Sequence, residues 1–295
     1  MINGTRLELK VNSEFGKLRA VIVQNPAEID ILNLEESSPD TSFYLREKDF
    51  HPEDANFNPI LLREQISAFQ KVLHKDKITL LYINTIPNAR YQLFTRDLGF
   101  VIGDTFYFSR MLNERRRIEY EGLEIIKKRL TKYQAIESGT IEGGDILING
   151  SHIYVGLTGR TNRDGFESLK SLVEKQGYCC IPIPCRKNIL HLDCRFNIIS
   201  PDTALIYGDD ILPEGRQNIK THFKGNIISG PTTEQDTLGS NFLILSPNLA
   251  VVERRNQWTI ETLGNQGYSV IPLDFSELIK LWGSFRCTTL PIYRK

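Results

Sequence analysis

The sequence has no net charge, because 36 lysine and arginine residues balance 36 aspartate and glutamate residues over 295 positions. Nucleic acids and anionic membrane surfaces attract proteins with a basic surplus, so neither is expected as a partner. No apolar run approaches the roughly 20 residues that cross a bilayer. The first residues also lack an apolar signal core and a small-residue cleavage site, which predicts a cytoplasmic protein.

The sequence also has no C-x-x-C motif and no histidine or cysteine spacing that is typical of zinc ligands. The five cysteines include no C-x-x-C pair, and an odd number without secretory context predicts free thiols. His152, His191 and His222 are not spaced as zinc ligands, and no phosphate loop or flavin motif occurs. We therefore expect neither a metal nor a cofactor. Cys287 differs from the other cysteines because it lies alone near the C-terminus, among glycine, serine and polar residues.

A hairpin pattern occurs four times in the sequence. Each copy has two apolar runs around a turn dipeptide, and the turns at 103, 150, 201 and 247 lie 47, 51 and 46 residues apart. Gly-Asp, Asn-Gly, Pro-Asp and Pro-Asn dipeptides favour tight turns. A helix and a short apolar strand follow the hairpins. The predicted helices cover residues 113–130, 162–176, 216–223 and 257–265, and three closing strands cover 178–183, 225–228 and 268–273.

The two ends of the chain supply a fifth unit of the same kind. A strand over residues 285–290 pairs with a strand over 18–23, and a helix over 59–73 and a strand over 78–82 complete the unit. A ring closed by its own termini has no open edge strands. The sequence therefore predicts one domain, residues 1–295, folded as a five-bladed α/β propeller of ββαβ repeats. A doubly wound α/β sheet is the alternative, but a G-x-G-x-x-G motif is missing and the strands come as hairpins.

Polar residues occur where the predicted blades begin. They are Asp97, Glu142, His191 with Asp193, the segment 236–241, and Cys287. In a propeller these positions converge on the central axis. An isolated acid before a strand usually caps a turn, and a lone histidine is usually structural. Their recurrence at equivalent positions instead predicts a catalytic constellation.

The residue types in this constellation favour chemistry on a guanidinium group. A cysteine thiolate is a strong nucleophile, and His191 can donate and accept a proton near neutral pH. Carboxylates that face a thiolate are unfavourable unless the substrate carries positive charge. Asp97 and Asp193 fit a guanidinium, whose planar N–H groups match carboxylates in pairs. We therefore expect Cys287 to attack a carbon that these hydrogen bonds make electrophilic.

Segments along nearly the whole chain resemble the guanidine-group-modifying (pentein) superfamily of arginine deiminases, dimethylargininases and amidinotransferases. They are Ser13–Leu18, Phe94–Asp97, Glu142–Asp145, His191–Asp193 and Gly283–Thr288. The set in this order, with a terminal cysteine, is specific, whereas each piece alone is weak. The resemblance implies the propeller fold and a small, arginine-like guanidino substrate, and it leaves a homodimer open.

The resemblance also implies a role for each residue of the constellation. Cys287 would be the nucleophile and His191 the general acid and base. Asp97 and Asp193 would clamp the guanidinium, and Glu142 would orient the histidine or the substrate. The implied reaction is hydrolysis of arginine or a substituted arginine through a covalent cysteine–amidino intermediate, which gives citrulline and ammonia or an amine. An amidinotransferase is the alternative, and a non-catalytic binding propeller is the least favoured interpretation.

Two arginines correspond to those that bind the substrate carboxylate in the family. One is Arg116, although its neighbours Arg115 and Arg117 compete for the inward position, and the other is Arg160. An arginine cluster of this kind is also typical of a solvated helix face, so the pattern alone leaves both interpretations open.

Departures from the family pattern leave the reaction subtype open. Deiminases carry an asparagine six residues before the position of Asp97, where this chain has Tyr91, and a large helical insertion that it lacks. Residues 25–58 lie in that interval instead, and their prolines and acids predict an irregular lid over the mouth of the ring. Dimethylargininases lack the insertion but usually also lack an acid at the position of Asp193.

Overall fold

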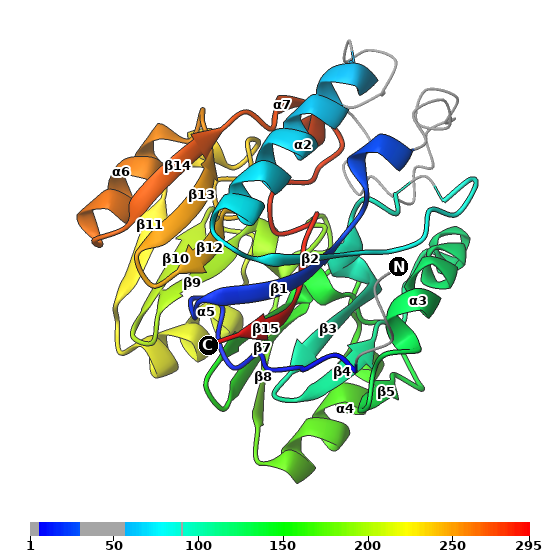
Figure 1. The fold of residues 1–295 in the computed structure, drawn as a ribbon. Helices are drawn as coiled ribbons and strands as arrows, with labels where there is room; N and C mark the ends of the chain where they lie inside the picture. Colours follow the sequence, from blue (N-terminus) through cyan, green and yellow to red (C-terminus); the bar gives the residue numbers. More distant parts are fainter. Residues whose placement is uncertain (1–5, 30–56, 90) are drawn as a thin grey trace.

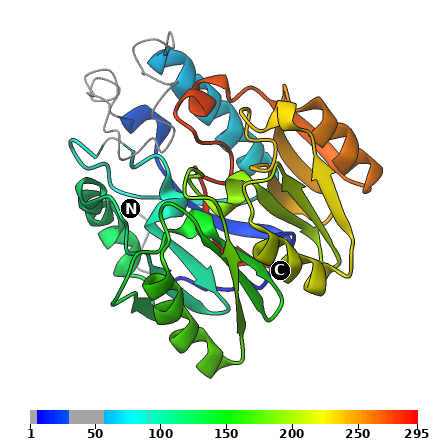
Figure 2. The ribbon, with the colours of Figure 1, turned by 180° about the vertical axis from the view of Figure 1, so that it is seen from behind.

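Five separate three-stranded sheets are arranged around a common axis in the computed structural model, which describes residues 6–29, 57–89 and 91–295 (Figure 1 and Figure 2). In every sheet the middle strand pairs antiparallel with one neighbour and parallel with the other. This order confirms the ββαβ repeat and the five-bladed α/β propeller. The doubly wound alternative is wrong, because that fold needs one continuous, mostly parallel sheet.

Each blade takes its three strands from consecutive parts of the chain, except that the blade containing β1 and β2 takes its third strand from the C-terminus. The blades are β15–β1–β2 (Leu290–Arg294, Leu18–Val23, Thr79–Tyr82), β3–β4–β5 (Gly99–Ile102, Thr105–Phe108, Tyr133–Ala135), β6–β7–β8 (Ile146–Asn149, His152–Leu157, Cys179–Pro184), β9–β10–β11 (Phe196–Ser200, Thr203–Tyr207, Ile227–Gly230) and β12–β13–β14 (Leu243–Ser246, Leu249–Glu253, Ser269–Leu273).

Helices cover the outside of the ring (Figure 1). They are α2 (Pro59–Lys75), η4 (Glu114–Leu123) with α3 (Glu124–Lys127), α4 (Arg163–Val173) with η6 (Glu174–Gln176), α5 (Pro213–Phe223), α6 (Gln257–Asn265) and α7 (Ser276–Lys280). In α2, Asn58 caps the first turn and Pro59 occupies the first helical position. Gly177, with φ +86°, ends the helix of the third blade. Within the described ranges, no helix is both long enough and apolar enough to span a bilayer.

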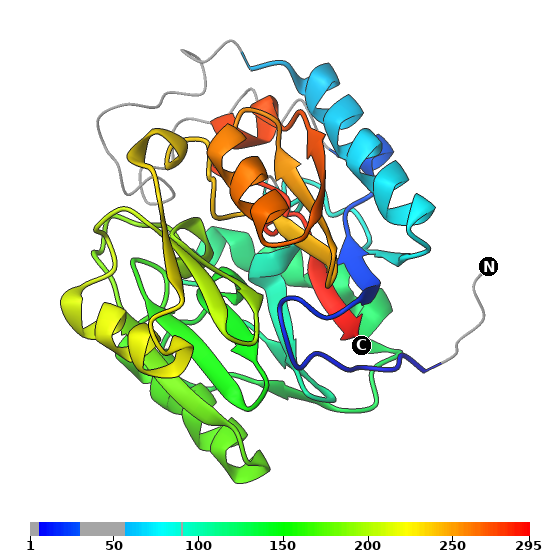
Figure 3. The same cartoon turned by 90° about the vertical axis from the view of Figure 1, so that its left-hand side faces the viewer.

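The chain ends meet in one blade, as the repeat predicts. β1 and β15 lie side by side and pair antiparallel, with Val21 opposite Pro291 (Figure 1 and Figure 3). The predicted strand over 285–290 is wrong, however, because β15 begins at Leu290. Residues 285–288 form a turn instead, in which Thr289 N donates to the carbonyl oxygen of Arg286 over 3.0 Å. This turn carries Cys287 out of the sheet.

The predicted amphipathic helix over 113–130 is also partly wrong. Most of this segment is the 3-10 helix η4, followed by one turn of α-helix. Side chains three residues apart share a face of a 3-10 helix, and the buried residues Arg116, Glu119 and Gly122 follow this spacing. Ile118, which an α-helical period places inward, is 40 % exposed. Other element boundaries differ from the prediction by a few residues. The strand predicted over 225–228 is β11 (Ile227–Gly230), which starts later because Gly225 adopts φ +86° after α5.

Burial falls from the first to the third strand of a blade. Residues Gly99–Ile102 of β3 are all buried, whereas Tyr133–Ala135 of β5 are all exposed. The first strands contact one another across blades, as in β3 with β15 and β6 with β9. The starts of the first strands therefore lie nearest the axis. Of the predicted lid, residues 30–56 lie outside the described residues, and Pro26–Glu28 forms the short 3-10 turn η1.

Candidate active site

Short turns at the start of the blades bring the predicted residues together. The 3-10 turns η3 (Thr95–Leu98), η5 (Gly143–Asp145) and η7 (Leu192–Cys194) each precede a first strand, and η5 contacts both others. The turn over residues 285–288 packs on η3, where Arg96 N donates to the carbonyl oxygen of Cys287 over 3.1 Å.

Two adjacent glycines allow these turns to pack closely. A Cβ atom on Gly143 would lie 2.1 Å from the carbonyl oxygen of Arg96, and one on Gly144 would lie 2.7 Å from Cγ and Nδ1 of His191. Both distances are far shorter than van der Waals contact. The Gly-Gly pair is therefore required for the close approach of η5 to its neighbours and to the imidazole.

His191 is held between two carboxylates. Its Nε2 lies 2.8 Å from Oε2 of Glu142 and its Nδ1 lies 3.7 Å from Oδ1 of Asp97. The side chain is buried. Burial alone would lower the pKa of His191, but Asp97, Glu142 and Asp145 together raise it to about 9. At neutral pH the imidazole therefore carries a proton that it can donate.

Glu142 remains ionised although it is fully buried. Its Oε1 accepts a hydrogen bond from Leu112 N over 3.1 Å and lies 3.8 Å from Nη1 of Arg160. Burial would raise the pKa of Glu142, but Arg160, His191 and Arg116 outweigh it and lower the pKa to about 2. Glu142 is therefore a fixed negative charge beside the histidine.

The thiol of Cys287 is protonated in this arrangement. Its Sγ lies 3.4 Å from Oδ1 of Asn241, and the residue is 4 % exposed. Burial, followed by interactions with Asp193, Cys194 and Asp97, raises the pKa of this thiol well above its ordinary value. The environment of Cys287 therefore favours the neutral thiol over the thiolate.

Each of the two predicted clamp residues accepts a hydrogen bond from an arginine through its Oδ2 atom. Oδ2 of Asp97 accepts from Nη1 of Arg116 over 2.8 Å, and Oδ2 of Asp193 accepts from Nε of Arg286 over 3.2 Å. Burial raises the pKa of Asp193. Oδ1 of Asp97 is buried and has no hydrogen-bond partner in the described part of the chain. It remains available as an acceptor for a ligand N–H group.

The two predicted carboxylate-binding arginines are both buried near Glu142. Arg116 is the inward residue of its cluster, since Arg115 and Arg117 are exposed. It binds Glu119 through Nε and Nη2 over 2.9 and 2.8 Å, in addition to Asp97. Burial opposes the charge of Arg116, but Glu119 and Asp97 outweigh it and raise its pKa. Binding of a substrate carboxylate by Arg116 and Arg160 stays a prediction.

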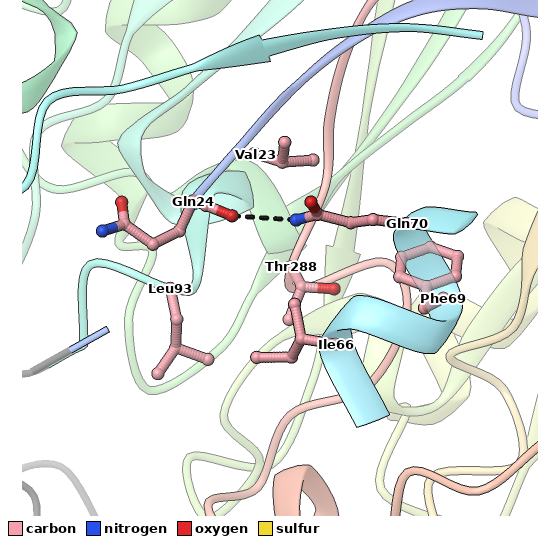
Figure 4. Close-up of a pocket in the computed structure, with 7 residues that line it drawn as sticks. All are labelled: Val23, Gln24, Ile66, Phe69, Gln70, Leu93 and Thr288. Atoms are coloured by element: carbon pink, nitrogen blue, oxygen red, sulfur yellow. Dashed lines mark hydrogen bonds between the residues drawn. The ribbon is translucent and has the colours of Figure 1, made fainter. Parts of the chain in front are cut away.

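A small cavity lies beside Thr288, the residue that follows Cys287 (Figure 4). Its volume is about 10 Å³, which accommodates one water molecule. Gln70 Nε2 donates to the carbonyl oxygen of Gln24 across its wall over 2.8 Å. The cavity is too small for any molecule larger than water.

Comparison with known proteins identifies the family. A family model described as N,N dimethylarginine dimethylhydrolase, eukaryotic, matches residues 13–294. The chain belongs to this family. The dimethylhydrolase family lies within the pentein superfamily, so the resemblance expected from the five sequence segments is confirmed.

Relatives of this dimethylhydrolase family member extend across the superfamily. The uncharacterized protein YkgA of Bacillus subtilis is 31 % identical over 96 % of this chain and 94 % of its own length. The dimethylarginine dimethylaminohydrolase of Pseudomonas aeruginosa is 27 % identical over 77 % of this chain and 87 % of its own length. An arginine deiminase of Staphylococcus aureus is 26 % identical over 72 % of this chain, which spans 64 % of that enzyme.

Solved structures with the same fold include a transferase and a hydrolase. The amidinotransferase SxtG of Microseira wollei superposes with a TM-score of 0.79 at 18 % identity over 97 % of both chains. The Pseudomonas aeruginosa dimethylargininase, in a cysteine-to-serine mutant bound to citrulline, superposes with a TM-score of 0.75 at 23 % identity, over 93 % of this chain and 99 % of that one. At these identities the likeness establishes the fold alone.

The sequence analysis missed several residues that hold the site of this dimethylhydrolase family member. Asp145 accepts from Leu192 N over 2.8 Å and from the hydroxyls of Thr158 and Thr161 over 2.9 and 2.6 Å. It thereby joins the turn after His191 to the loop of Arg160, and burial raises its pKa to about 7. Its position in the segment Glu142–Asp145, which resembles the family, is the feature of the sequence that could have identified Asp145 as part of the site.

Other missed residues lie further away in the sequence. Glu119 follows Arg116 at the spacing of one helical turn, which is a weak signal for an ion pair. Glu14 binds Nη1 of Arg286 over 2.7 Å. Asn241, which lies in the predicted segment 236–241 without a role assigned to it, accepts from Arg286 N over 3.1 Å. These pairings join residues 272 and 45 positions apart, so spacing in the sequence carries no information about them.

One group of side chains has a geometry that a metal ion could use. Asp97, Glu142 and His191 each place a ligand atom within 4.8 Å of the others. The guanidinium groups of Arg116 and Arg160 already face these two carboxylates, and their positive charge opposes a further cation. The expectation of no metal site rested on histidine spacing, which cannot detect a cluster with one histidine and two acids.

Proposed function

We propose that the protein is a cysteine-dependent hydrolase of the guanidino group of arginine or a substituted arginine. The observation that carries this proposal is the buried Oδ1 of Asp97, which lies 3.7 Å from Nδ1 of His191 and has no hydrogen-bond donor among the described residues. A substrate guanidinium supplies the missing N–H donor and the positive charge that the acids around Cys287 require. The related Pseudomonas aeruginosa dimethylargininase, at 27 % identity, supports the same substrate class.

Substrate binding would activate the nucleophile. A guanidinium between Asp97 and Asp193 neutralises the two carboxylate charges that contribute to the raised pKa of Cys287. The thiol then loses its proton to solvent, and the thiolate is stabilised by the adjacent substrate cation. The substrate itself thus supplies the positive charge that the free site lacks.

The reaction would proceed in two additions to the same carbon. The thiolate of Cys287 adds to the guanidinium carbon, and His191 donates its proton to the departing nitrogen as the C–N bond breaks. A covalent amidino thioether remains. Neutral His191 then accepts one proton from water as the oxygen adds to the carbon. The C–S bond breaks as the hydroxyl of this adduct loses its second proton to the released ammonia or amine, which leaves a neutral ureido product and restores the thiolate.

Arg160 is proposed as the main contact of the substrate carboxylate. Its loop is tied to the turn after His191 through Asp145, which sets the distance between the carboxylate end and the guanidinium end of the substrate. Arg116 is proposed to help bind the substrate carboxylate and also to orient Asp97. Its hydrogen bond holds Oδ2 of Asp97, which leaves Oδ1 available for the substrate guanidinium.

Product analysis tests the hydrolase proposal. The purified protein is incubated with arginine, methylated arginines and agmatine, and the products are identified by mass spectrometry. We expect citrulline, with ammonia or an alkylamine, and we expect Cys287→Ser to abolish its formation. Cys179→Ser, which changes an exposed thiol outside the site, serves as the matched control and retains full activity. Turnover by the Cys287→Ser variant would refute the proposal.

An amidinotransferase is the second candidate, and the burial of the site favours it. Cys287 and His191 are 4 % and 1 % exposed, and exclusion of water protects a covalent intermediate from hydrolysis. A transferase releases ornithine from arginine only when an acceptor amine such as glycine is present. The same incubations with and without glycine therefore distinguish the two reactions.

A further inference from the structure

Three buried arginines surround Glu14 next to the turn that carries Cys287. They are Arg96 of η3, Arg286 of the turn over 285–288, and Arg294 of β15, which are 5, 1 and 2 % exposed. All three act electrostatically on Glu14. Arg96 Nε also donates to the carbonyl oxygen of Arg286 over 3.3 Å. The three guanidinium groups therefore form one group, the axial arginine cluster.

The axial arginine cluster contains four nitrogens without a hydrogen-bond partner among the described residues. They are Nη2 of Arg96, Nη2 of Arg286, and Nε and Nη2 of Arg294. Buried donors in native proteins are almost always satisfied by protein, water or an ion. The existing acceptors are already engaged: Oε1 of Glu14 accepts from Ile148 N, and Oε2 accepts from Arg286.

The cluster also has a surplus of positive charge. Three guanidinium groups face two carboxylates, Glu14 and Asp193, so three positive and two negative charges leave one positive charge unbalanced. Burial, together with repulsion by Arg286, lowers the pKa of Arg96 to about 10. Burial and the same kind of repulsion lower the pKa of Arg294 to about 9. Guanidinium groups keep their proton in proteins. The unbalanced positive charge therefore requires a nearby negative charge.

We propose that the axial arginine cluster binds one small monovalent anion of halide size. A single anion balances the extra charge and provides an acceptor that the buried N–H groups of the cluster lack. Water molecules would satisfy donors but would leave the charge uncompensated. The cluster shares Asp193 with the proposed substrate site through Nε of Arg286, but its four unpartnered nitrogens belong to none of the residues proposed to bind substrate, and the proposal does not depend on the proposed reaction.

Thermal unfolding of the wild-type protein tests the proposal without any substitution. The melting temperature is measured as chloride or bromide replaces gluconate, a large anion, at constant ionic strength. A ligand bound only by the folded state stabilises it in a saturable way. We expect Tm to rise by several degrees and then level off for the small anions. A Tm that is identical in chloride, bromide and gluconate would overturn the proposal.

Crystals grown in bromide provide a direct measurement. Anomalous scattering is expected to give a single buried peak within hydrogen-bond distance of Arg294 Nε and Arg96 Nη2. Water oxygens at these positions, with no anomalous signal, would contradict the proposal even if the protein showed a general salt effect.

A pair of substitutions distinguishes loss of anion binding from the general destabilisation that removal of any buried arginine causes. Arg294→Gln removes one positive charge, so the remaining cluster is neutral and the chloride dependence of Tm is expected to disappear. Arg195→Gln is the matched control, because Arg195 is equally buried but paired with Asp210 over 2.7 Å. It should lower Tm and keep the chloride dependence. Retention of that dependence in Arg294→Gln would overturn the proposal, and the bromide measurement remains decisive if this variant fails to fold.

Discussion

Nε2 of His191 lies 2.8 Å from Oε2 of Glu142, and both side chains are buried. The two residues come from different blades and meet only because η5 and η7 pack together at the axis. This hydrogen bond acts together with the charges of Asp97 and Asp145 to raise the pKa of His191, and it thereby helps to set the pH range in which the histidine can act as an acid.

The first prediction concerns the pH profile of Glu142→Gln. Glutamine keeps the shape of the side chain but removes its charge, so the pKa of His191 falls below the value of about 9. Activity that needs protonated His191 is lost as pH rises, and in the variant this loss moves to lower pH. We expect kcat to fall by about 10²-fold. Glu114→Gln, at an exposed position, is the control, and an unshifted profile in Glu142→Gln would contradict the assignment.

The second prediction separates thiol ionisation from turnover. Asp193→Asn removes the charge that, after burial, contributes most to the raised pKa of Cys287. Alkylation of Cys287 by iodoacetamide at pH 8 should become faster by about tenfold, whereas turnover should fall by about 10²-fold because the substrate loses a clamp. Asp164→Asn on the surface should change neither rate. Equal changes of both rates in the same direction would show that Asp193 does not bind substrate.

The third prediction compares two glycine-to-alanine substitutions. In Gly144→Ala the new Cβ would lie 2.7 Å from the His191 ring, so the imidazole must shift, and a displacement of this size costs about 10²-fold in activity. At Gly264, in α6, the added Cβ meets no described heavy atom within 4 Å. Gly264→Ala should retain activity and gain about 0.5–1 kcal/mol of stability. Activity assays and urea unfolding measure both effects; unchanged activity of Gly144→Ala would argue against a close contact between η5 and the histidine.

The fourth prediction is a loss of stability at alkaline pH. The pKa of His191 is raised from 6.5 to about 9 on folding, so its contribution is fully present below pH 6.5 and disappears as pH rises through about 9. The difference corresponds to about 3 kcal/mol of unfolding free energy. Urea unfolding between pH 6 and 10 should show this decline in the wild type and a flatter curve in His191→Gln. The exposed His74 provides the control substitution His74→Gln, which should leave the decline in place.

Much of the fold could be predicted from local patterns. Turn dipeptides and apolar periodicity depend on neighbours in the sequence, and they located the hairpins, α6 and the closing of the ring by the two termini correctly. The errors occurred where tertiary contacts overrode local preference. Residues 114–123 wind as a 3-10 helix that buries Arg116 and Glu119, and residues 285–288 leave the sheet to place Cys287 against η3.

The sequence by itself determined the repeat, the blade starts and the residue types that gather there, because each of these follows from short-range spacing. Only the tertiary structure decided which charges face one another. The pairing of Arg116 with Glu119 and Asp97, the contact of Glu14 with Arg286, and the protonated state of Cys287 depend on burial and on distances between blades. Electrostatic energy in a protein interior varies with distance and with exclusion of water, and neither quantity is encoded at a fixed separation along the chain.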